Sequence, residues 1–164
     1  MSSRFVVAIL GGVGAGKNLL AEKLPRQFTR SQNLKIEILP VKSLENLERS
    51  GKCDYKVYID RPLDELLEKY VNSLPIRKLI DKPQLAKNMA EFRRFHLKSV
   101  LPMRYSANFY LTNVEDHDRI HQLAMEILKE QRSLEKGEDV ESEDVQVYLN
   151  RRIQKTHPSK IGGF

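Results

Sequence analysis

A glycine-rich turn near the N-terminus constrains the fold of this chain more than any other segment. Residues 4–10, RFVVAIL, form an apolar run bounded by glycine, which is typical of a strand buried on both faces. The glycines of GGVGAG follow at residues 11–16, and a helix is predicted from about Gly14–Gly16 to Leu24, because Pro25 disfavours its continuation. The sequence therefore predicts a buried strand that turns sharply into a helix.

The turn has the spacing of a phosphate-binding loop. Gly11, four residues, Gly16 and Lys17 match the Walker A pattern up to its last position. Glycines let the backbone approach an anion, and successive N–H groups and the helix N-terminus then face the phosphates, while the lysine reaches the outer ones. We expect the nucleotide to be held by eight residues of this segment: Gly12, Val13, Gly14, Ala15, Gly16, Lys17, Asn18 and Leu19. The alternative is a structural turn with a solvated lysine.

The residue after the lysine departs from the pattern. Asn18 stands where a serine or threonine hydroxyl normally ligates Mg²⁺, although an amide oxygen is also a possible ligand for a hard cation. Asp60, which ends the apolar run YKVYID, is the carboxylate expected to act in catalysis and to help hold the metal. Its alternative role is to cap the next helix. Nucleotide binding is therefore better supported than catalysis.

Further strands and helices alternate along the chain. Strands are predicted at about 34–41, 55–60 and 107–113, and helices from Pro62, over about 85–101, and from a cap at Asp116. Residues 75–88, which contain Pro75 and Pro83, are predicted as a loop. A short amphipathic turn follows a cap at Ser43. This order predicts an α/β fold, a three-layer parallel sheet with helices on both faces. Residues 1–136 are expected to form the nucleotide-binding domain, and 137–164 a charged tail that is helical in part.

Composition narrows the possible partners. The net charge of +6 favours an anionic ligand, but acidic and basic residues are mostly interspersed, so the charge alone is weak support for nucleic acid. The apolar run at the N-terminus is too short to cross a bilayer and has no secretory cleavage pattern. We therefore expect a cytoplasmic protein with no membrane partner.

The order of these segments resembles P-loop kinases of the uridine kinase and phosphoribulokinase type. GGVGAGKNLLAEKL is similar to their opening loop and helix, and CDYKVYIDRPLDELLEKY is similar to the strand and helix that lead into their lid. RRFHLKSVLPMRYSANFYLTN resembles the stretch before and through their last core strand. The resemblance covers roughly residues 4–130. It implies a P-loop NTPase-type sheet that binds ATP and Mg²⁺.

The resemblance also implies roles for residues outside the loop. Arg77 lies where the lid of that group contributes phosphate-binding arginines, and Arg93 and Arg94 lie beyond it. Asn113 lies in the loop that is near the adenine in such folds. The acceptor region is shortened, however, and no aspartate directly follows the strand at 34–41 to serve as a base. His117 and His121 share a helical face, but no third metal ligand accompanies them, so we interpret them as surface residues.

Three functions follow as hypotheses. The first is an ATP-dependent phosphotransferase acting on a nucleoside or another small hydroxyl compound, with Lys17, Asp60 and Arg77 as catalytic residues. The second is a catalytically impaired nucleotide-binding module that serves a protein partner or a second copy of the chain. The third is an NTPase that acts on nucleic acid; it depends on net charge alone, so we do not expect nucleic acid as a partner.

Overall fold

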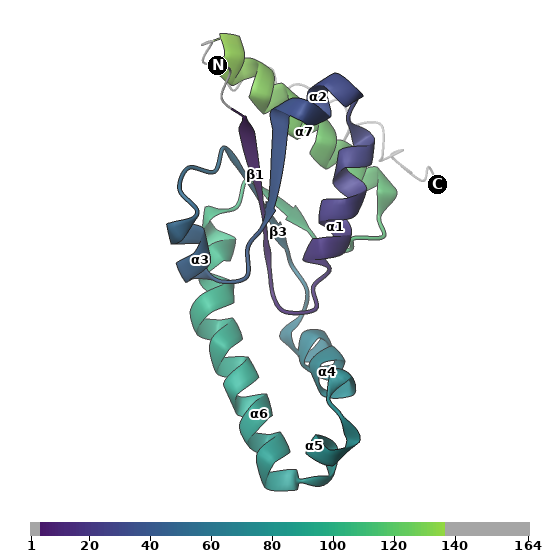
Figure 1. The fold of residues 1–164 in the computed structure, drawn as a ribbon, viewed down its shortest axis with the longest axis vertical. Helices are drawn as coiled ribbons and strands as arrows, with labels where there is room; N and C mark the ends of the chain where they lie inside the picture. The colour runs from purple at the N-terminus through teal and green to yellow at the C-terminus, as the bar shows by residue number, and fades with distance from the viewer. Residues whose placement is uncertain (1–3, 137–164) are drawn as a thin grey trace, which may run out of the picture. The chain divides into compact units, whose positions relative to one another are not determined.

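The computed structural model describes residues 4–136. The chain divides into two compact units, residues 1–129 and 130–164, and the predicted tail at 137–164 lies outside the described residues. The first unit contains one sheet of four parallel strands in the order β2-β1-β3-β4 (Figure 1). The strands are β1 (Phe5–Gly11), β2 (Ile36–Pro40), β3 (Tyr55–Ile59) and β4 (Phe109–Leu111).

Helices connect all of these strands. They are α1 (Lys17–Lys23), α2 (Arg30–Lys35), α3 (Leu44–Arg49), α4 (Leu63–Ser73), α5 (Ile76–Ile80), α6 (Lys82–Phe95) and α7 (His117–Lys136). A π-helical turn, η2 (His96–Val100), continues α6, and 3₁₀ turns form η1 (Leu24–Gln27) and η3 (Leu101–Ser106). The predicted parallel sheet flanked by helices is confirmed.

Alternation along the central strand explains the layers. In β1, Val7 and Ile9 belong to one buried cluster, which also contains residues of α1, α4 and α7. Ala8 and Leu10 belong to a second cluster with Leu47 of α3. Because successive side chains of a strand point to opposite faces, each face of the sheet has its own core. This arrangement is compatible with a three-layer α/β fold.

The largest difference from the sequence-based expectation concerns residues 75–88, which form α5 and most of α6 rather than a loop. The two prolines that suggested a break begin helices instead. Pro75 is the N-cap residue of α5, and Pro83 lies in the first turn of α6, where a missing N–H costs nothing. Asp81 caps α6 by accepting a hydrogen bond of 3.1 Å from the Gln84 amide.

α4 and α6 run away from the sheet edge as a pair, joined through α5 at their far end (Figure 1). We call this pair with its connection the arm, residues 63–95. The rings of Tyr70 and Phe92 stack with centroids 4.7 Å apart and hold the two helices together.

Among residues 4–136, no helix has the length and apolar character needed to span a membrane.

Candidate phosphate site

The backbone of the glycine-rich loop adopts conformations that require glycine. Gly14 and Gly16 have φ angles of +82° and +99°, which side-chain-bearing residues rarely adopt. The Ala15 amide donates to the Gly12 carbonyl at 3.1 Å, and α1 begins at Lys17 directly after left-handed Gly16. The sequence prediction of a sharp turn from strand into helix is confirmed.

Lys17 lies folded into this loop. Its Nζ donates hydrogen bonds to the carbonyl oxygens of Gly11 and Gly12, at 2.9 and 2.8 Å. Burial, and secondarily the charge of Lys42, lowers the pKa of Lys17 to about 8. The loop therefore holds a cation that is poorly compensated by its surroundings, and an anion bound beside it would relieve this cost.

Residues from distant segments surround the loop closely. A Cβ atom on Gly12 would lie 2.6 Å from Leu66 Cδ1 of α4, and one on Gly16 would lie 3.0 Å from Val114 Cγ2. The Lys69 ammonium of α4 donates to the Gly14 carbonyl at 3.3 Å. The glycines thus serve close packing as well as conformation, and α4 adds a second cation at the loop.

The sheet register brings two further charged residues to the same edge. Ile9 pairs with Pro40 on one side and Gly11 pairs with Ile59 on the other. Lys42 and Asp60 therefore follow the two strands that flank β1, at the end where the loop begins. Ligands of open parallel sheets bind at the carboxyl ends of strands where the strand order reverses, and with this order that point lies between β1 and β3.

Asp60 is already engaged in an ion pair. Its Oδ2 lies 3.1 Å from Arg104 Nη2, and its backbone N–H donates to the Leu111 carbonyl at 2.8 Å. Burial and the Asp60 charge raise the pKa of Tyr58, a residue of β3 two positions before Asp60. Asp60 is therefore a charged, half-buried carboxylate at the predicted position, but its partner is an arginine of η3.

The two residues expected at the metal, Asn18 and Asp60, offer few oxygen ligands for Mg²⁺. Asn18 is exposed and offers one amide oxygen, and Asp60 offers a carboxylate once it separates from Arg104. No cluster of three or more His, Cys, Asp or Glu side chains suited to a metal occurs among the described residues. Because Mg²⁺ usually binds through one or two protein oxygens together with substrate phosphates, this donor set fits only a metal brought in by a nucleotide.

Asn113 lies in the connection from β4 to α7, which packs on the glycine-rich loop through Val114. Its Oδ1 accepts from the Glu115 amide at 2.9 Å, so its side chain stabilises a local turn. The Lys23 ammonium of α1 holds this connection in place by donating hydrogen bonds to the Val114 carbonyl, at 3.1 Å, and to the Glu115 carboxylate, at 3.0 Å. The structure therefore brings the predicted base-binding segment together with the loop.

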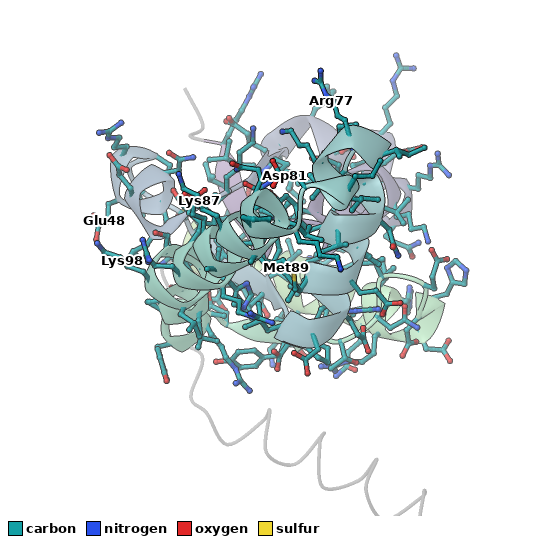
Figure 2. All side chains as sticks on the ribbon, turned by 90° about the horizontal axis from the view of Figure 1, so that it is seen from below. Glu48, Arg77, Asp81, Lys87, Met89 and Lys98 are labelled. Atoms are coloured by element: carbon teal, nitrogen blue, oxygen red, sulfur yellow. The ribbon has the colours of Figure 1, made fainter. Side chains whose placement is uncertain are left out.

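The predicted lid arginines lie elsewhere. Arg77 is exposed on α5 at the far end of the arm (Figure 1) and points outward from it (Figure 2). Arg93 and Arg94 are exposed near the end of α6. Arg77 is thus not assembled with Lys17 in this structure, because residues 75–88 are helical instead of forming a loop over the site.

The histidines of the described residues differ in their exposure. His117 and His121 are exposed, in agreement with their interpretation as surface residues, and His121 Nδ1 lies 3.4 Å from Gln27 Oε1. His96, in contrast, is only 5% exposed and lies against Gly12.

Sequence reasoning missed three groups at this site, namely Lys42, Lys69 and His96. Lys42 could have been found, because it follows the predicted strand at 34–41 and the carboxyl ends of parallel strands share one edge. Lys69 and His96 gave no such signal, because their positions depend on how the arm meets the loop.

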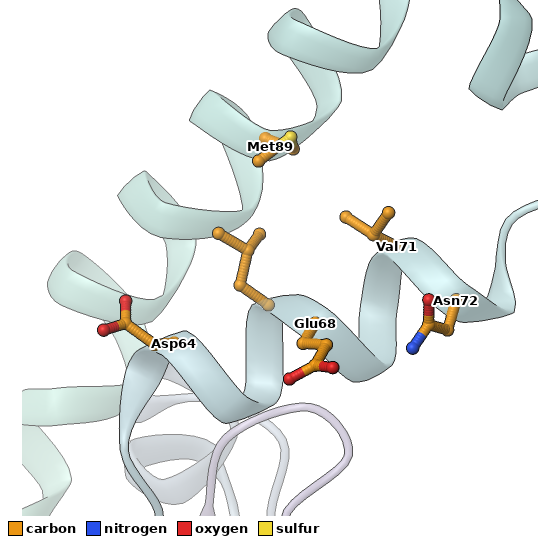
Figure 3. Close-up of a pocket in the computed structure, with 6 residues that line it drawn as sticks. Asp64, Glu68, Val71, Asn72 and Met89 are labelled. Atoms are coloured by element: carbon orange, nitrogen blue, oxygen red, sulfur yellow. The ribbon is translucent and has the colours of Figure 1, made fainter.

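A pocket with a volume of about 270 Å³ lies between α4 and α6 (Figure 3). Apolar and polar side chains line it: Asp64, Leu67, Glu68, Val71, Asn72 and Met89. It is separate from the residues predicted for nucleotide binding.

A scan of the chain against models of known protein families finds no match, and a search of curated proteins finds no relative either.

Proposed function

We propose that the chain is an ATP-dependent phosphotransferase with a P-loop-type sheet, which holds the nucleotide phosphates in the loop of residues 11–17. The position of Lys17 carries this proposal. Its ammonium lies within the glycine loop on two backbone carbonyls and has a lowered pKa. This ammonium is partly buried, whereas the alternative interpretation of the sequence, a structural turn, predicts a solvated lysine.

In this proposal, different residues around the loop would bind the phosphates, the base and the metal. The loop amides and Lys17 would bind the phosphates, with Lys69 and Lys42 adding positive charge around them. The turn at Asn113 would lie beside the base. Asn18 and Asp60 would hold Mg²⁺ together with phosphate oxygens, and the metal would supply neutralisation of charge during in-line transfer to a small hydroxyl compound.

Two observations favour a second candidate function, nucleotide binding without transfer. Asp60 is paired with Arg104, and Arg77 lies at the far end of the arm. With Asn18 in place of a hydroxyl residue, the chain would then bind a nucleotide as a signal to a protein partner or to a second copy.

A calorimetric titration tests whether the protein binds a nucleotide. ATP and ADP, each with Mg²⁺, are added to the wild type and to Lys17→Met, and dissociation constants are measured by calorimetry. We expect binding to the wild type and a loss of at least tenfold in the variant, because a charged hydrogen bond to phosphate contributes roughly 1.5–3 kcal/mol. Lys87→Met, at an exposed lysine of α6, is the matched control and should bind like the wild type.

A screen of hydroxyl-bearing acceptors then tests transfer. ADP release from ATP that rises with one acceptor and vanishes in Lys17→Met supports the phosphotransferase. Tight binding with no release for any acceptor supports the second candidate. No binding of either nucleotide to the folded wild type would reject both.

A further inference from the structure

His96 is a buried polar group whose hydrogen-bonding capacity is not used. The side chain is only 5% exposed, and its Nδ1 is fully buried with no hydrogen-bond partner among the described residues. Nearly all buried polar atoms in native proteins are paired, since an unpaired one costs roughly 1–3 kcal/mol. A buried imidazole nitrogen without a partner therefore points to a group that arrives with a ligand.

The imidazole edge with this nitrogen faces the phosphate loop. A Cβ atom built on Gly12 would lie 3.0 Å from both His96 Nδ1 and His96 Cε1. Gly12 is also one of the two residues whose carbonyl oxygens hold the Lys17 ammonium. The imidazole and the ammonium thus meet at the same loop residue, and burial together with the Lys17 charge lowers the pKa of His96.

The backbone that carries His96 is unusual as well. α6 ends at Phe95, and His96 is the first residue of the π-helical turn η2, which runs to Val100. Such turns insert one extra residue per turn and occur frequently at functional sites. Here the turn lies where α6 returns from the arm to the loop.

We propose that His96 is a ligand-binding residue of the phosphate site, whose Nδ1–H donates a hydrogen bond to the terminal phosphate of a bound nucleoside triphosphate. This inference rests on the proposed function, since it assumes a nucleotide in the loop. The terminal phosphate is the group that would draw the Lys17 ammonium away from Gly12, because a Walker lysine reaches the outer phosphates. His96 then gives the site a preference for triphosphates over diphosphates.

The test compares ATP and ADP in three His96 variants. His96→Leu removes both ring nitrogens, His96→Asn keeps a polar atom near the place of Nδ1, and His96→Gln keeps one near Nε2. Dissociation constants for both nucleotides are measured by calorimetry. His121→Leu, at an exposed histidine of α7, is the matched control.

We expect His96→Leu and His96→Gln to weaken ATP binding about tenfold or more and to change ADP binding less than twofold. His96→Asn should recover part of the ATP affinity. A structural role would instead lower affinity for both nucleotides together and lower the unfolding temperature of the ligand-free protein. Equal losses for ATP and ADP, or no loss in His96→Leu, would overturn the inference.

A spectroscopic readout supplements the affinities. The imidazole ¹⁵N resonances of His96, assigned by their absence in His96→Asn, should shift on addition of ATP and much less on addition of ADP. Identical spectra with both nucleotides would contradict the assignment. If the wild type binds neither nucleotide, the proposed function fails first and the role of His96 fails with it. Normal binding with unaffected His96 variants rejects the role of His96 alone.

Discussion

The low pKa of Lys17 makes a quantitative prediction about stability. In an unfolded chain this lysine titrates near its usual value of 10.5, whereas in the fold its pKa is about 8. Between these two values the unfolded chain binds more protons, so the free energy of unfolding rises with pH across this window. Below pH 8 the folded protein bears the full cost of a charged, partly buried ammonium.

The size of this cost follows from the shift. A change from 10.5 to about 8 corresponds to roughly 3.4 kcal/mol at 1.36 kcal/mol per pKa unit, and partial exposure of the side chain reduces it to about 1–2 kcal/mol. Lys17→Met removes the titrating group but keeps an unbranched side chain. We therefore expect the wild type to gain about 1–2 kcal/mol relative to Lys17→Met between pH 7 and pH 10.

Urea unfolding of both proteins, without nucleotide, at several pH values across this range measures the difference. Contributions of groups that both proteins share cancel in the comparison. Lys87→Met, at an exposed lysine, should show no such change relative to the wild type. Parallel stability curves for wild type and Lys17→Met over the whole range would refute the reasoning that the loop holds a destabilised cation.

Three further substitutions, one of them with a control variant, test the site. Asn18→Thr supplies the missing hydroxyl and should raise the affinity for ATP in Mg²⁺ relative to that in EDTA; an unchanged ratio would contradict the metal assignment. Gly16→Ala should destabilise the fold by roughly 1–3 kcal/mol in urea, because its φ is +99° and its Cβ would meet Val114 at 3.0 Å. In the control Gly51→Ala, φ is +80° and the new Cβ would meet no other atom, so the loss of stability should come from backbone strain alone. Equal losses of stability in the two variants would contradict a cost of the contact with Val114. Arg104→Gln frees Asp60 from its ion pair. The free energy of unfolding should change by less than about 1 kcal/mol because the pair is partly exposed, while the Mg²⁺-dependent ATP affinity should rise.

Local chemistry made much of the fold predictable. The continuous apolar run of β1, bounded by glycine, was sufficient to predict a strand buried on both faces. Ser43 and Asp116 cap their helices as expected, accepting from the amides of Asn46 and Arg119. These features depend on neighbours a few residues away, which a sequence displays directly.

Other elements depended on interactions that the sequence does not display. α2 begins at a capping box in which Thr29 and Gln32 satisfy each other, with no apolar periodicity to reveal a helix. Pro75 and Pro83 suggested a loop because a proline is compatible with both a turn and the start of a helix. Likewise, nothing local distinguishes His96 from the exposed histidines, because its burial follows from the path of α6 back to the loop.

The stacked rings of Tyr70 and Phe92 have a mechanical consequence. They couple α4, which carries Lys69 to the loop, to α6, which leads into His96. Two residues beside the glycine-rich loop, Lys69 and His96, are therefore carried by one packed helix pair, whose far end is α5. A fluorescent probe attached to α5 would therefore test whether a nucleotide added to the protein moves the whole arm.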